Sequence, residues 1–520
     1  MKSIYLTEAH SIFRNSVRQF MDKEVAPFAD AWERDCRIPK EIWAHMGKLG
    51  FLGISFPEEF GGTGADIFYS LIFLEELARS QMGGFAAAVG VQQFVATGAI
   101  FNQGTSALKE RYLVPSIAGT KVGAICISEP NTGSDVAAIQ TTAVREGESW
   151  VINGAKTWVT NGVYADFYVI ACKTDREAGA GGISLILADA KTSGITSNKL
   201  RKMGWHSSDT AELSLENLRV PASNLIGQHG QGFYYIMQTF VMERLTVAAS
   251  SVGCSFVALE KTLAYMETRQ AFGKPINRFQ ALRHRIADLA TELEAARQLV
   301  YHAAWLHGQG EQAVKESSMA KLLTTELSNR VMAECLQFYG GFGYVEEYPM
   351  ARFYRDARVS TIVAGTSEIM REIIAKVVID KMEFPKIPSA LESESATVAE
   401  PVTGTETESE IVASSLADLM RSLAKRHRPE RTEGWKGLFH FKFKDSANPM
   451  WTVLIDSNRC QVSEGLSGTP DCIVTTSEAV YLAIEQGRQN AEMAVLTRKL
   501  KISNMGAMMK FSKAFKRVTT

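Results

Sequence analysis

The chain has 520 residues, 46% of them hydrophobic and 22% charged, with a net charge of -1 at pH 7. This length exceeds what one hydrophobic core supports and predicts two to four domains. The near-zero charge gives no overall field for nucleic acid or an anionic membrane surface. Seven scattered cysteines, without metal-ligand spacing, predict reduced thiols and no bound metal. The polar N-terminus and the lack of a long apolar run predict no membrane span and a cytoplasmic location.

Helical and β patterns alternate along the first part of the chain. Residues 1–120 are expected to be helical, because Phe13, Val17 and Phe20 recur at helical spacing. Residues 121–233 change to short β-branched runs separated by turns, which is typical of a β domain.

Helical periodicity returns in residues 234–382. Leu282, Ile286, Leu289 and Leu293 follow a 4-3-4 spacing with polar residues between them. This stripe is typical of an amphipathic helix in a bundle.

A change of composition separates the C-terminal part of the chain. Residues 383–410 are rich in Ser, Thr, Glu and Pro and poor in large apolar side chains, so we expect a disordered linker. Residues 411–520 have an α+β pattern. Two of its expected strands carry apolar faces, formed by Phe439, Phe441 and Phe443 and by Trp451, Val453 and Ile455.

Two local signals are expected to shape the end of this part. Thr475 and Glu478 have the spacing of a capping box that would open the helix AVYLAIEQ. Met505, Met508 and Met509 share a helix face. Their pliable side chains would line an apolar ligand site, or would simply be core.

Chemistry-bearing residues gather in the stretch 123–162. The turn SEPNTGSD, residues 128–135, would aim backbone N–H groups at a phosphate or pyrophosphate. Trp158 and Thr160 lie two apart on an expected strand and would share one face beside a planar heterocycle. Asn153-Gly154 predicts a hairpin turn. The simpler interpretation is an antiparallel sheet with a core tryptophan.

Six ordered motifs resemble the acyl-CoA dehydrogenase family. They are FPEEFGGTGAD (56–66), SEPNTGSD (128–135), INGAKTWVTNG (152–162), RQAFGKPI (269–276), QFYGGFGY (337–344) and AGTSEIMRE (364–372). The resemblance implies an α-helical N-domain, a β-barrel-like middle domain and a C-terminal four-helix bundle in a homodimer or homotetramer. It also implies FAD-dependent α,β-dehydrogenation of an acyl-CoA thioester to the trans-2-enoyl-CoA, with electrons passed to an electron-transfer flavoprotein.

The position of the base departs from the commonest family pattern. Many members place a glutamate directly before the Gly-Thr of the last motif, where this chain has Ala364. The isovaleryl and long-chain types place it before an arginine on another helix, which here is Glu243, followed by Arg244. The apolar run around Glu243 would raise the proton affinity of its carboxylate. The alternative is an ordinary surface ion pair between Glu243 and an arginine.

The resemblance also implies the binding residues. Glu368 matches a residue near the adenosine half of the cofactor, although its place at a helix start also suits a capping role. Val241 replaces an acidic residue of some members. Cofactor contacts are implied for Ile127, Ser128, Ser134, Trp158, Thr160, Thr366 and Glu368, and contacts with a neighbouring subunit's cofactor for Arg269, Phe272, Gln280, Gln337 and Gly341. Substrate contacts are implied for Ser134, Val241, Arg244, Ala364 and Gly365.

The C-terminal segment resembles the sterol carrier, or non-specific lipid transfer, family through FKFKD, GTPDCIVTTSEAV and LKISNMGAMMKF. This resemblance implies a tunnel for an apolar lipid ligand. Two other functions stay open: a non-enzymatic lipid or acyl-CoA carrier with a degenerate flavin module, and a flavin oxidase on the same fold.

Overall fold

The computed structural model divides the chain into two compact units, Met1–Ala399 and Glu400–Thr520. The predicted linker, residues 383–410, lies outside the residues that the structure describes. Those residues are 3–382, 416–429, 432, 435–446, 449–456, 459–485, 494, 499–504, 507–508, 511 and 514–515.

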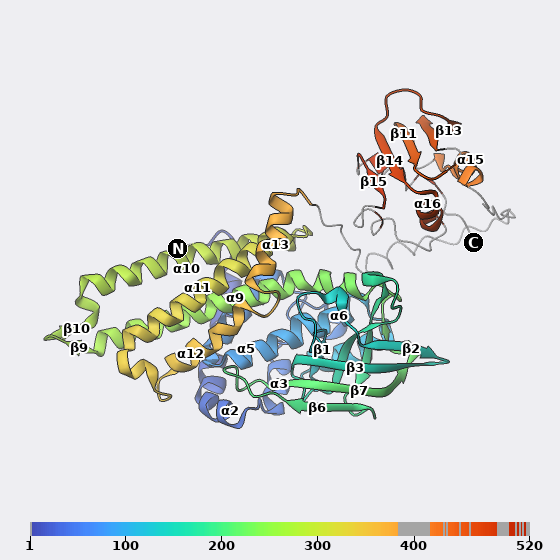
Figure 1. Cartoon of the computed structure of the whole chain (residues 1–520). Helices are drawn as coiled ribbons and strands as arrows, with labels where there is room; N and C mark the ends of the chain where they lie inside the picture. The colour runs from blue at the N-terminus through green and yellow to red at the C-terminus, as the bar shows by residue number, and fades with distance from the viewer. Residues whose placement is uncertain are drawn as a thin grey trace. The chain divides into compact units, whose positions relative to one another are not determined.

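The first unit begins with helices, as the sequence predicts (Figure 1). Val17 and Phe20 are buried in the core of this helical region, and Phe13 packs against it. The helix Ile67–Leu77 is buried on nearly all sides and starts where the Asp66 carboxylate accepts the N–H of Phe68 at 2.8 Å. The helices are α1 (Glu8–Phe20), α2 (Ala29–Asp35), α3 (Lys40–Lys48), α4 (Ile67–Leu77), α5 (Gly83–Gly90), a π-helical segment (Val91–Ala96), α6 (Thr97–Gln103), α7 (Ser106–Leu108) and α8 (Val114–Ile117).

A mostly antiparallel sheet follows, which confirms the sheet-rich middle part. Its strand order is β6-β7-β3-β2-β4-β5-β8, and β1 pairs in parallel with β4. The strands are β1 (Gly123–Cys126), β2 (Thr142–Glu146), β3 (Ser149–Thr160), β4 (Phe167–Lys173), β5 (Ile183–Asp189), β6 (Ile195–Lys199), β7 (Thr210–Pro221) and β8 (Leu225–Ile226).

The hairpin turn expected at Asn153-Gly154 is wrong. This pair lies inside β3, at a bulge where the register with β7 shifts between Ile152 and Gly154. Gly154 has φ +152°, and a Cβ there would lie 2.5 Å from the Thr141 hydroxyl oxygen, so glycine is needed for close packing. The turn between β2 and β3 instead lies at residues 147–148, where the sheet pairs Glu146 with Ser149.

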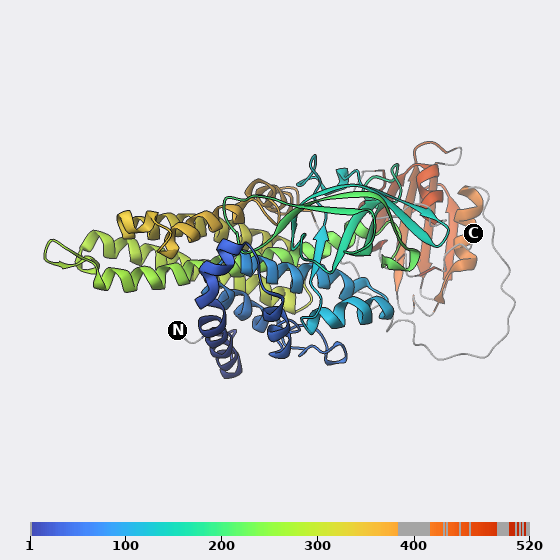
Figure 2. The ribbon, with the colours of Figure 1, turned by 90° about the horizontal axis from the view of Figure 1, so that it is seen from below.

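Long helices form the remainder of the first unit and extend away from the sheet (Figures 1 and 2). The predicted stripe is confirmed, because Leu289 and Leu293 are buried in the core of the bundle and Leu282 and Ile286 pack against it. A two-stranded hairpin lies at the far end from the sheet. These elements are α9 (Gly232–Thr268), β9 (Gln270–Ala271), β10 (Lys274–Pro275), α10 (Gln280–Gly308), α11 (Val314–Tyr339), α12 (Pro349–Arg358) and α13 (Ser367–Val378).

Two helical segments correct the expectation that no stretch of the chain is apolar enough to cross a membrane. Gly83–Gln103 and Gly232–Thr268 meet that criterion by length and composition. The apolar windows of the two segments are 78% and 61% buried inside the protein. Their hydrophobicity is therefore accounted for by packing in the core of the first unit.

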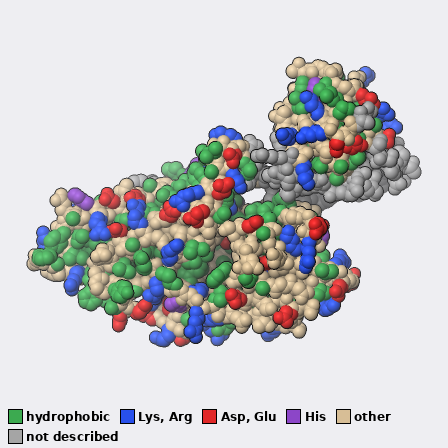
Figure 3. Space-filling model, viewed as in Figure 1, with side chains coloured by type: hydrophobic (Ala, Val, Ile, Leu, Met, Phe, Trp, Pro, Cys, Tyr) green, Lys and Arg blue, Asp and Glu red, His purple; other side chains and the backbone are tan. Residues whose placement is uncertain are grey.

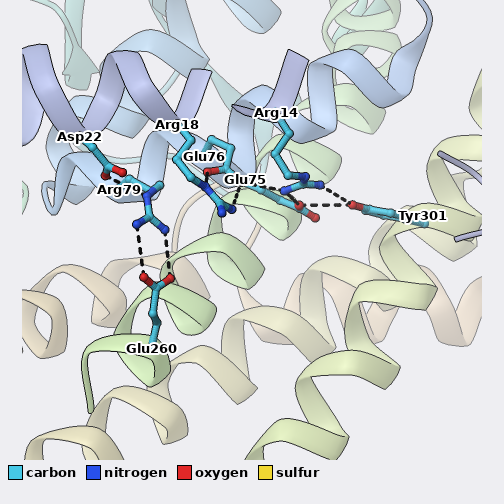
Figure 4. A network of polar contacts seen from close by, with 8 residues as sticks. All are labelled: Arg14, Arg18, Asp22, Glu75, Glu76, Arg79, Glu260 and Tyr301. Atoms are coloured by element: carbon cyan, nitrogen blue, oxygen red, sulfur yellow. Dashed lines mark hydrogen bonds and ion pairs between the residues drawn. The ribbon is translucent and has the colours of Figure 1, made fainter. Parts of the chain in front are cut away.

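A network of charged side chains ties α1 to α4 and the bundle (Figure 4). The Arg14 guanidinium lies 2.8 Å from a carboxylate oxygen of both Glu75 and Glu76, and the Tyr301 hydroxyl donates to Glu75 at 3.2 Å. Both glutamates are buried, so removing one cation would leave an uncompensated charge. Arg18, Asp22, Arg79 and Glu260 complete the network.

The second unit is α+β, as expected. Its five-stranded sheet has the order β13-β12-β11-β14-β15. The six predicted residues Phe439, Phe441, Phe443, Trp451, Val453 and Ile455 are all in its core, and His440, which alternates with them on β11, is also buried. The elements are α15 (Leu416–Arg426), β11 (Lys436–Phe443), β12 (Met450–Asp456), β13 (Arg459–Glu464), β14 (Cys472–Thr476), α16 (Glu478–Glu485) and β15 (Lys501–Ile502).

The predicted capping box is wrong in its first residue. Thr475 lies in β14 and pairs with Lys501 of β15, so its position is set by the sheet. The helix α16 instead begins after Ser477, whose hydroxyl accepts the N–H of Val480 at 3.3 Å. Asp445 accepts the N–H of Glu478 at 2.8 Å.

Candidate active site

Three of the predicted site residues lie within about one turn of α9. Val241 and Arg244 are buried, with exposed fractions of 5% and 6%, and Glu243 is partly buried. The Glu243 Oε2 atom is itself buried and has no hydrogen-bond partner among the described residues. Burial raises the pKa of Glu243 to about 7, against the opposing effects of Arg244 and Lys321, and lowers the pKa of Arg244 to about 10.

The expected alternative, a surface ion pair between Glu243 and an arginine, is not formed. Within the described part of the chain, Glu243 is in no ion pair, and the Arg244 Nε also lacks a partner. A carboxyl group kept in this way without a strong partner retains its capacity to accept a proton near neutral pH.

The segment 364–366 forms a strained turn before α13. Ala364 and Gly365 both have left-handed backbones, with φ of +55° and +85°. The Ala364 N–H donates to no residue that the structure describes. Thr366 caps α13 by accepting the N–H of Ile369 at 3.3 Å.

Glu368 lies in the first turn of α13 and is exposed. Its pKa is lowered, chiefly by a backbone hydrogen bond at the helix start and by the Thr366 hydroxyl. This is the environment of the capping role, and the carboxylate lies at the protein surface.

Lys321 is a residue of this region that sequence reasoning missed. It lies on α11, is fully buried, and donates to the Gly365 carbonyl at 2.6 Å. The sequence feature that could have identified Lys321 is its position as the one charged residue on a helix face formed by the small residues Ser317, Ala320 and Thr324, all of which are buried. Small residues on one face predict close helix packing, so a lysine among them predicts a specific partner.

The turn 128–135 has the features of an anion-binding nest. Gly133, Ser134 and Asp135 are exposed, and their backbone N–H groups donate to no described residue. Three consecutive free donors suit a pyrophosphate. Ile127 and Ser128, at the start of the turn, are partly buried.

A buried ion pair below this turn was also missed. The Lys156 ammonium donates to Glu129 at 2.7 Å and to the Ile127 carbonyl at 3.1 Å. Glu129 also accepts the N–H groups of Gln140 and Thr141. The pair therefore holds the turn against β3, and its sequence signal was a lysine and a glutamate in two adjacent motifs.

Trp158 is not the core tryptophan of the simpler interpretation. It is 65% exposed, has φ +59°, and lies in a bulge of β3 between Lys156 and Val159. The bulge breaks the alternation that was expected to put Trp158 and Thr160 on one face. The indole instead forms an exposed aromatic surface, and Thr160 is partly buried.

Five other predicted residues gather at the hairpin end of the bundle, away from the sheet (Figure 1). Phe272, at the hairpin tip, has φ +49° and is 95% exposed, and Tyr344 is 86% exposed. The Arg269 guanidinium lies over the Phe342 ring, 5.6 Å from its centroid. Figure 3 shows hydrophobic side chains gathered over this end. The five residues are Arg269, Phe272, Gln280, Gln337 and Gly341, all exposed.

The second unit contains an open pocket of about 480 Å³ at the edge strand β13, with polar and apolar lining in similar amounts. Of the three methionines expected either to line an apolar ligand site or to be core, Met508 packs against the core and does not line this pocket, and Met505 and Met509 lie outside the described residues. The pocket is lined by Arg421, Ala424, Leu438, Thr452, Leu454, Cys460, Gln461, Val462, Ser463 and Ser467.

Neither metal chemistry nor disulfide chemistry is indicated by the described residues. Within them, no group of three or more His, Cys, Asp or Glu side chains is placed to hold a metal ion. All seven cysteines are described, and all are free thiols.

Family comparisons assign both units. The models of the N-terminal, middle and C-terminal domains of acyl-CoA dehydrogenases match residues 7–120, 124–218 and 230–379. The SCP-2 sterol transfer family matches residues 416–516.

Individual relatives agree with this assignment. The rat protein "Long-chain specific acyl-CoA dehydrogenase, mitochondrial" is 39% identical over 382 residues, which cover 73% of this chain and 88% of the relative. An acyl-CoA dehydrogenase structure from Geobacillus kaustophilus is 42% identical, with a TM-score of 0.71, and covers 73% of this chain and 100% of its own. The structure of a glutaryl-coenzyme A dehydrogenase in complex with glutaryl-CoA is 34% identical, with a TM-score of 0.71, and the match covers 73% of this chain and 98% of that protein's chain. The chain therefore belongs to the acyl-CoA dehydrogenase family of oxidoreductases and carries a C-terminal SCP-2 sterol transfer domain.

Proposed function

We propose that the first unit catalyses FAD-dependent α,β-dehydrogenation of an acyl-CoA thioester to the trans-2-enoyl-CoA, with Glu243 as the acceptor of the α-proton. The observation that carries this proposal is the Glu243 carboxyl group, whose buried Oε2 has no partner among the described residues and whose pKa is raised to about 7. A base with a pKa near the working pH is most effective against a weak carbon acid.

Proton removal also requires stabilisation of the negative charge that develops on the thioester oxygen. The N–H of Ala364 is a free donor in a fixed turn, so we assign it this role. Val241, Arg244, Gly365 and Ser134 would line the path of the thioester and its pantetheine arm. When bound, FAD would accept the hydride that leaves the β-carbon.

The residues present suit FAD. The free N–H groups at 133–135 would hold the pyrophosphate, with Ser134 beside them, and the exposed Trp158 would cover a ring face. Ile127, Ser128 and Thr160 would contact the ring system. Thr366 and Glu368 would lie toward the adenosine half.

We further propose a homodimer or homotetramer in which the hairpin end of one subunit completes the cofactor site of another. Arg269, Phe272, Gln280, Gln337 and Gly341 would make these contacts. Support comes from Phe272 and Tyr344, since aromatic side chains this exposed are typical of an interface.

The domain organisation proposed for the chain is the one expected from the sequence: a helical domain (1–120), a β domain (121–233), a helical bundle (234–382), a linker (383–410) and a lipid-binding domain (411–520). The last segment would carry an apolar lipid, for which the pocket of about 480 Å³ is the candidate space. Such a ligand could be delivered to, or removed from, the dehydrogenase.

Anaerobic addition of acyl-CoA thioesters of increasing chain length tests the proposed reaction. The purified protein should be yellow and should bleach with at least one thioester. A colourless protein, or a yellow one that no chain length bleaches, contradicts the proposal and favours a lipid carrier. Electron transfer from the bleached protein to an electron-transfer flavoprotein, with slow reoxidation in air, is expected, whereas rapid reoxidation by air identifies an oxidase.

A further inference from the structure

Lys321 interacts with two parts of the candidate site: it contacts the turn 364–366, and its charge acts on Glu243 of α9. It projects from α11 with no exposed surface, and its ammonium donates to the Gly365 carbonyl at 2.6 Å. Burial lowers the pKa of Lys321 to about 8, whereas Glu243 acts to raise it. An ammonium group is costly to bury, so its retention at this position calls for a specific interaction.

The first such interaction is with the strained turn. Ala364 has a left-handed backbone, which is unfavourable for an L-residue with a Cβ atom. Strain of this kind persists only when surrounding contacts fix it. The hydrogen bond from Lys321 fixes the peptide between Gly365 and Thr366, one residue beyond Ala364, and the Ala364 N–H has no partner within the described residues.

The second interaction is electrostatic. Two cations lower the pKa of the Glu243 carboxyl against its burial: Arg244, on the same helix, and Lys321, on α11. The segment 91–103, which packs beside α9, contributes only uncharged side chains. Toward Lys321 itself, Glu326 and Glu368 add negative charge, and Arg371 is paired with Glu326.

We propose that Lys321 is a positioning residue for the proton-transfer step: it holds Ala364 and Gly365 of the 364–366 turn in their left-handed form, and its charge favours the ionised form of Glu243, which accepts the proton. This inference rests on the proposed function. A lysine with only a structural role would change stability when replaced but would leave the pH dependence of proton transfer where it was.

The variants Lys321→Met, Lys321→Gln and Lys321→Arg separate these contributions. Methionine removes both the charge and the donor, glutamine keeps a donor without charge, and arginine keeps both. Lys315→Met is the matched control, because Lys315 lies on the same helix with a partly exposed side chain paired to Glu316. Circular dichroism and FAD content establish that each variant is folded and loaded.

The first readout is the rate of anaerobic flavin reduction between about pH 6 and 9 with the thioester that reduces wild type fastest. The wild-type rate should rise with pH through an acid limb near pH 7, because Glu243 must be ionised. Loss of the Lys321 charge should move this limb upward by about one pH unit in the methionine and glutamine variants. Lys321→Arg and Lys315→Met should keep the wild-type limb.

The second readout is independent of activity. Hydrogen–deuterium exchange of the peptide that contains 362–367, in FAD-loaded protein without substrate, should be about tenfold faster in Lys321→Met and close to wild type in Lys321→Arg. If Lys321→Met does not fold, Lys321→Gln still tests the charge. A wild-type acid limb in either soluble neutral variant overturns the inference. Failure of wild type to bleach with any acyl-CoA instead contradicts the proposed function. The exchange measurement then still tests whether Lys321 holds the turn, and unchanged exchange in Lys321→Met contradicts that role.

Discussion

The Lys156 ammonium and the Glu129 carboxylate form an ion pair of 2.7 Å that is almost wholly shielded from water, with exposed fractions of 0% and 7%. Burial alone would raise the pKa of Glu129, but Lys156, together with hydrogen bonds from Thr141 and the Gln140 backbone, lowers it below its ordinary value. The same ammonium reaches the Ile127 carbonyl. The pair therefore fixes the turn proposed to bind pyrophosphate.

Replacing Lys156 with methionine should destabilise the first unit by about 3–5 kcal/mol, because the Glu129 carboxylate would be left buried without its cation. FAD content should fall with it, since the turn loses its anchor. Chemical denaturation and the ratio of flavin to protein absorbance measure the two effects. Lys191→Met, at an exposed position of the same sheet domain, is the control, and equal stability of the two variants would refute this interpretation.

Glu243→Gln should abolish bleaching by acyl-CoA, with a fall of about 10³-fold in the rate of flavin reduction, and should retain FAD. Glu368→Gln should instead weaken FAD retention, because Glu368 is exposed at the start of α13, and should leave the rate per bound flavin nearly unchanged. Stopped-flow absorbance and flavin content measure both effects. Equal losses of rate in the two variants would leave the base unassigned.

Glu243→Gln should also stabilise the protein at high pH. The pKa of Glu243 is raised from 4.5 to about 7 in the folded state, so an ionised carboxylate opposes folding as the pH rises through this interval. The neutral variant should be more stable above pH 7 by about 3 kcal/mol, and the difference should vanish below about pH 4.5. Denaturant unfolding across this range provides the measurement. A constant difference at all pH values would contradict the raised pKa.

Phe272→Ser should weaken self-association at least about tenfold, because burial of a phenylalanine contributes roughly 1.5–3 kcal/mol. Phe272 is 95% exposed in the single chain, so the folded subunit itself should be little affected. Sedimentation velocity at several concentrations measures the assembly. Val144→Ser, at an exposed position of β2, is the control, and unchanged assembly of the Phe272 variant would remove the hairpin from the proposed interface.

Trp451→Ala should destabilise the second unit alone. Trp451 is 1% exposed in a core separate from those of the first unit, so its truncation should cost about 3–5 kcal/mol there. Calorimetry should show one transition moved to lower temperature, with anaerobic flavin reduction unchanged. Met450→Ala, at an exposed neighbouring position, is the control. A shift of both transitions would show that the two units unfold together.

Features governed by local interactions were predicted well. Glu368 was expected near a helix start and lies in the first turn of α13, residues 367–378, because the Thr366 cap that begins this helix is a local interaction. The three phenylalanines of β11 entered the core of the second unit for the same reason, as strict alternation fixes one face of a strand.

Local signals gave the wrong prediction where contacts with residues distant in sequence determined the backbone conformation. Asn153-Gly154 favours a turn, but close packing against Thr141 places it inside β3. Thr475 has the spacing of a cap, but pairing with Lys501 keeps it in the sheet. In both cases, contacts distant in sequence outweighed a preference worth little by itself.

By itself, the sequence determined the order of helical and β segments, the apolar faces that build the cores, and the family motifs with Ala364 in place of the usual base. Only the tertiary structure decided that Glu243 lacks an ion-pair partner, that Lys321 reaches the Gly365 carbonyl, and that Trp158 lies exposed on a bulge. The reason is physical: periodicity and capping depend on neighbours within a few residues, whereas burial, charge pairing and a carboxyl pKa depend on groups that only the folded chain brings together.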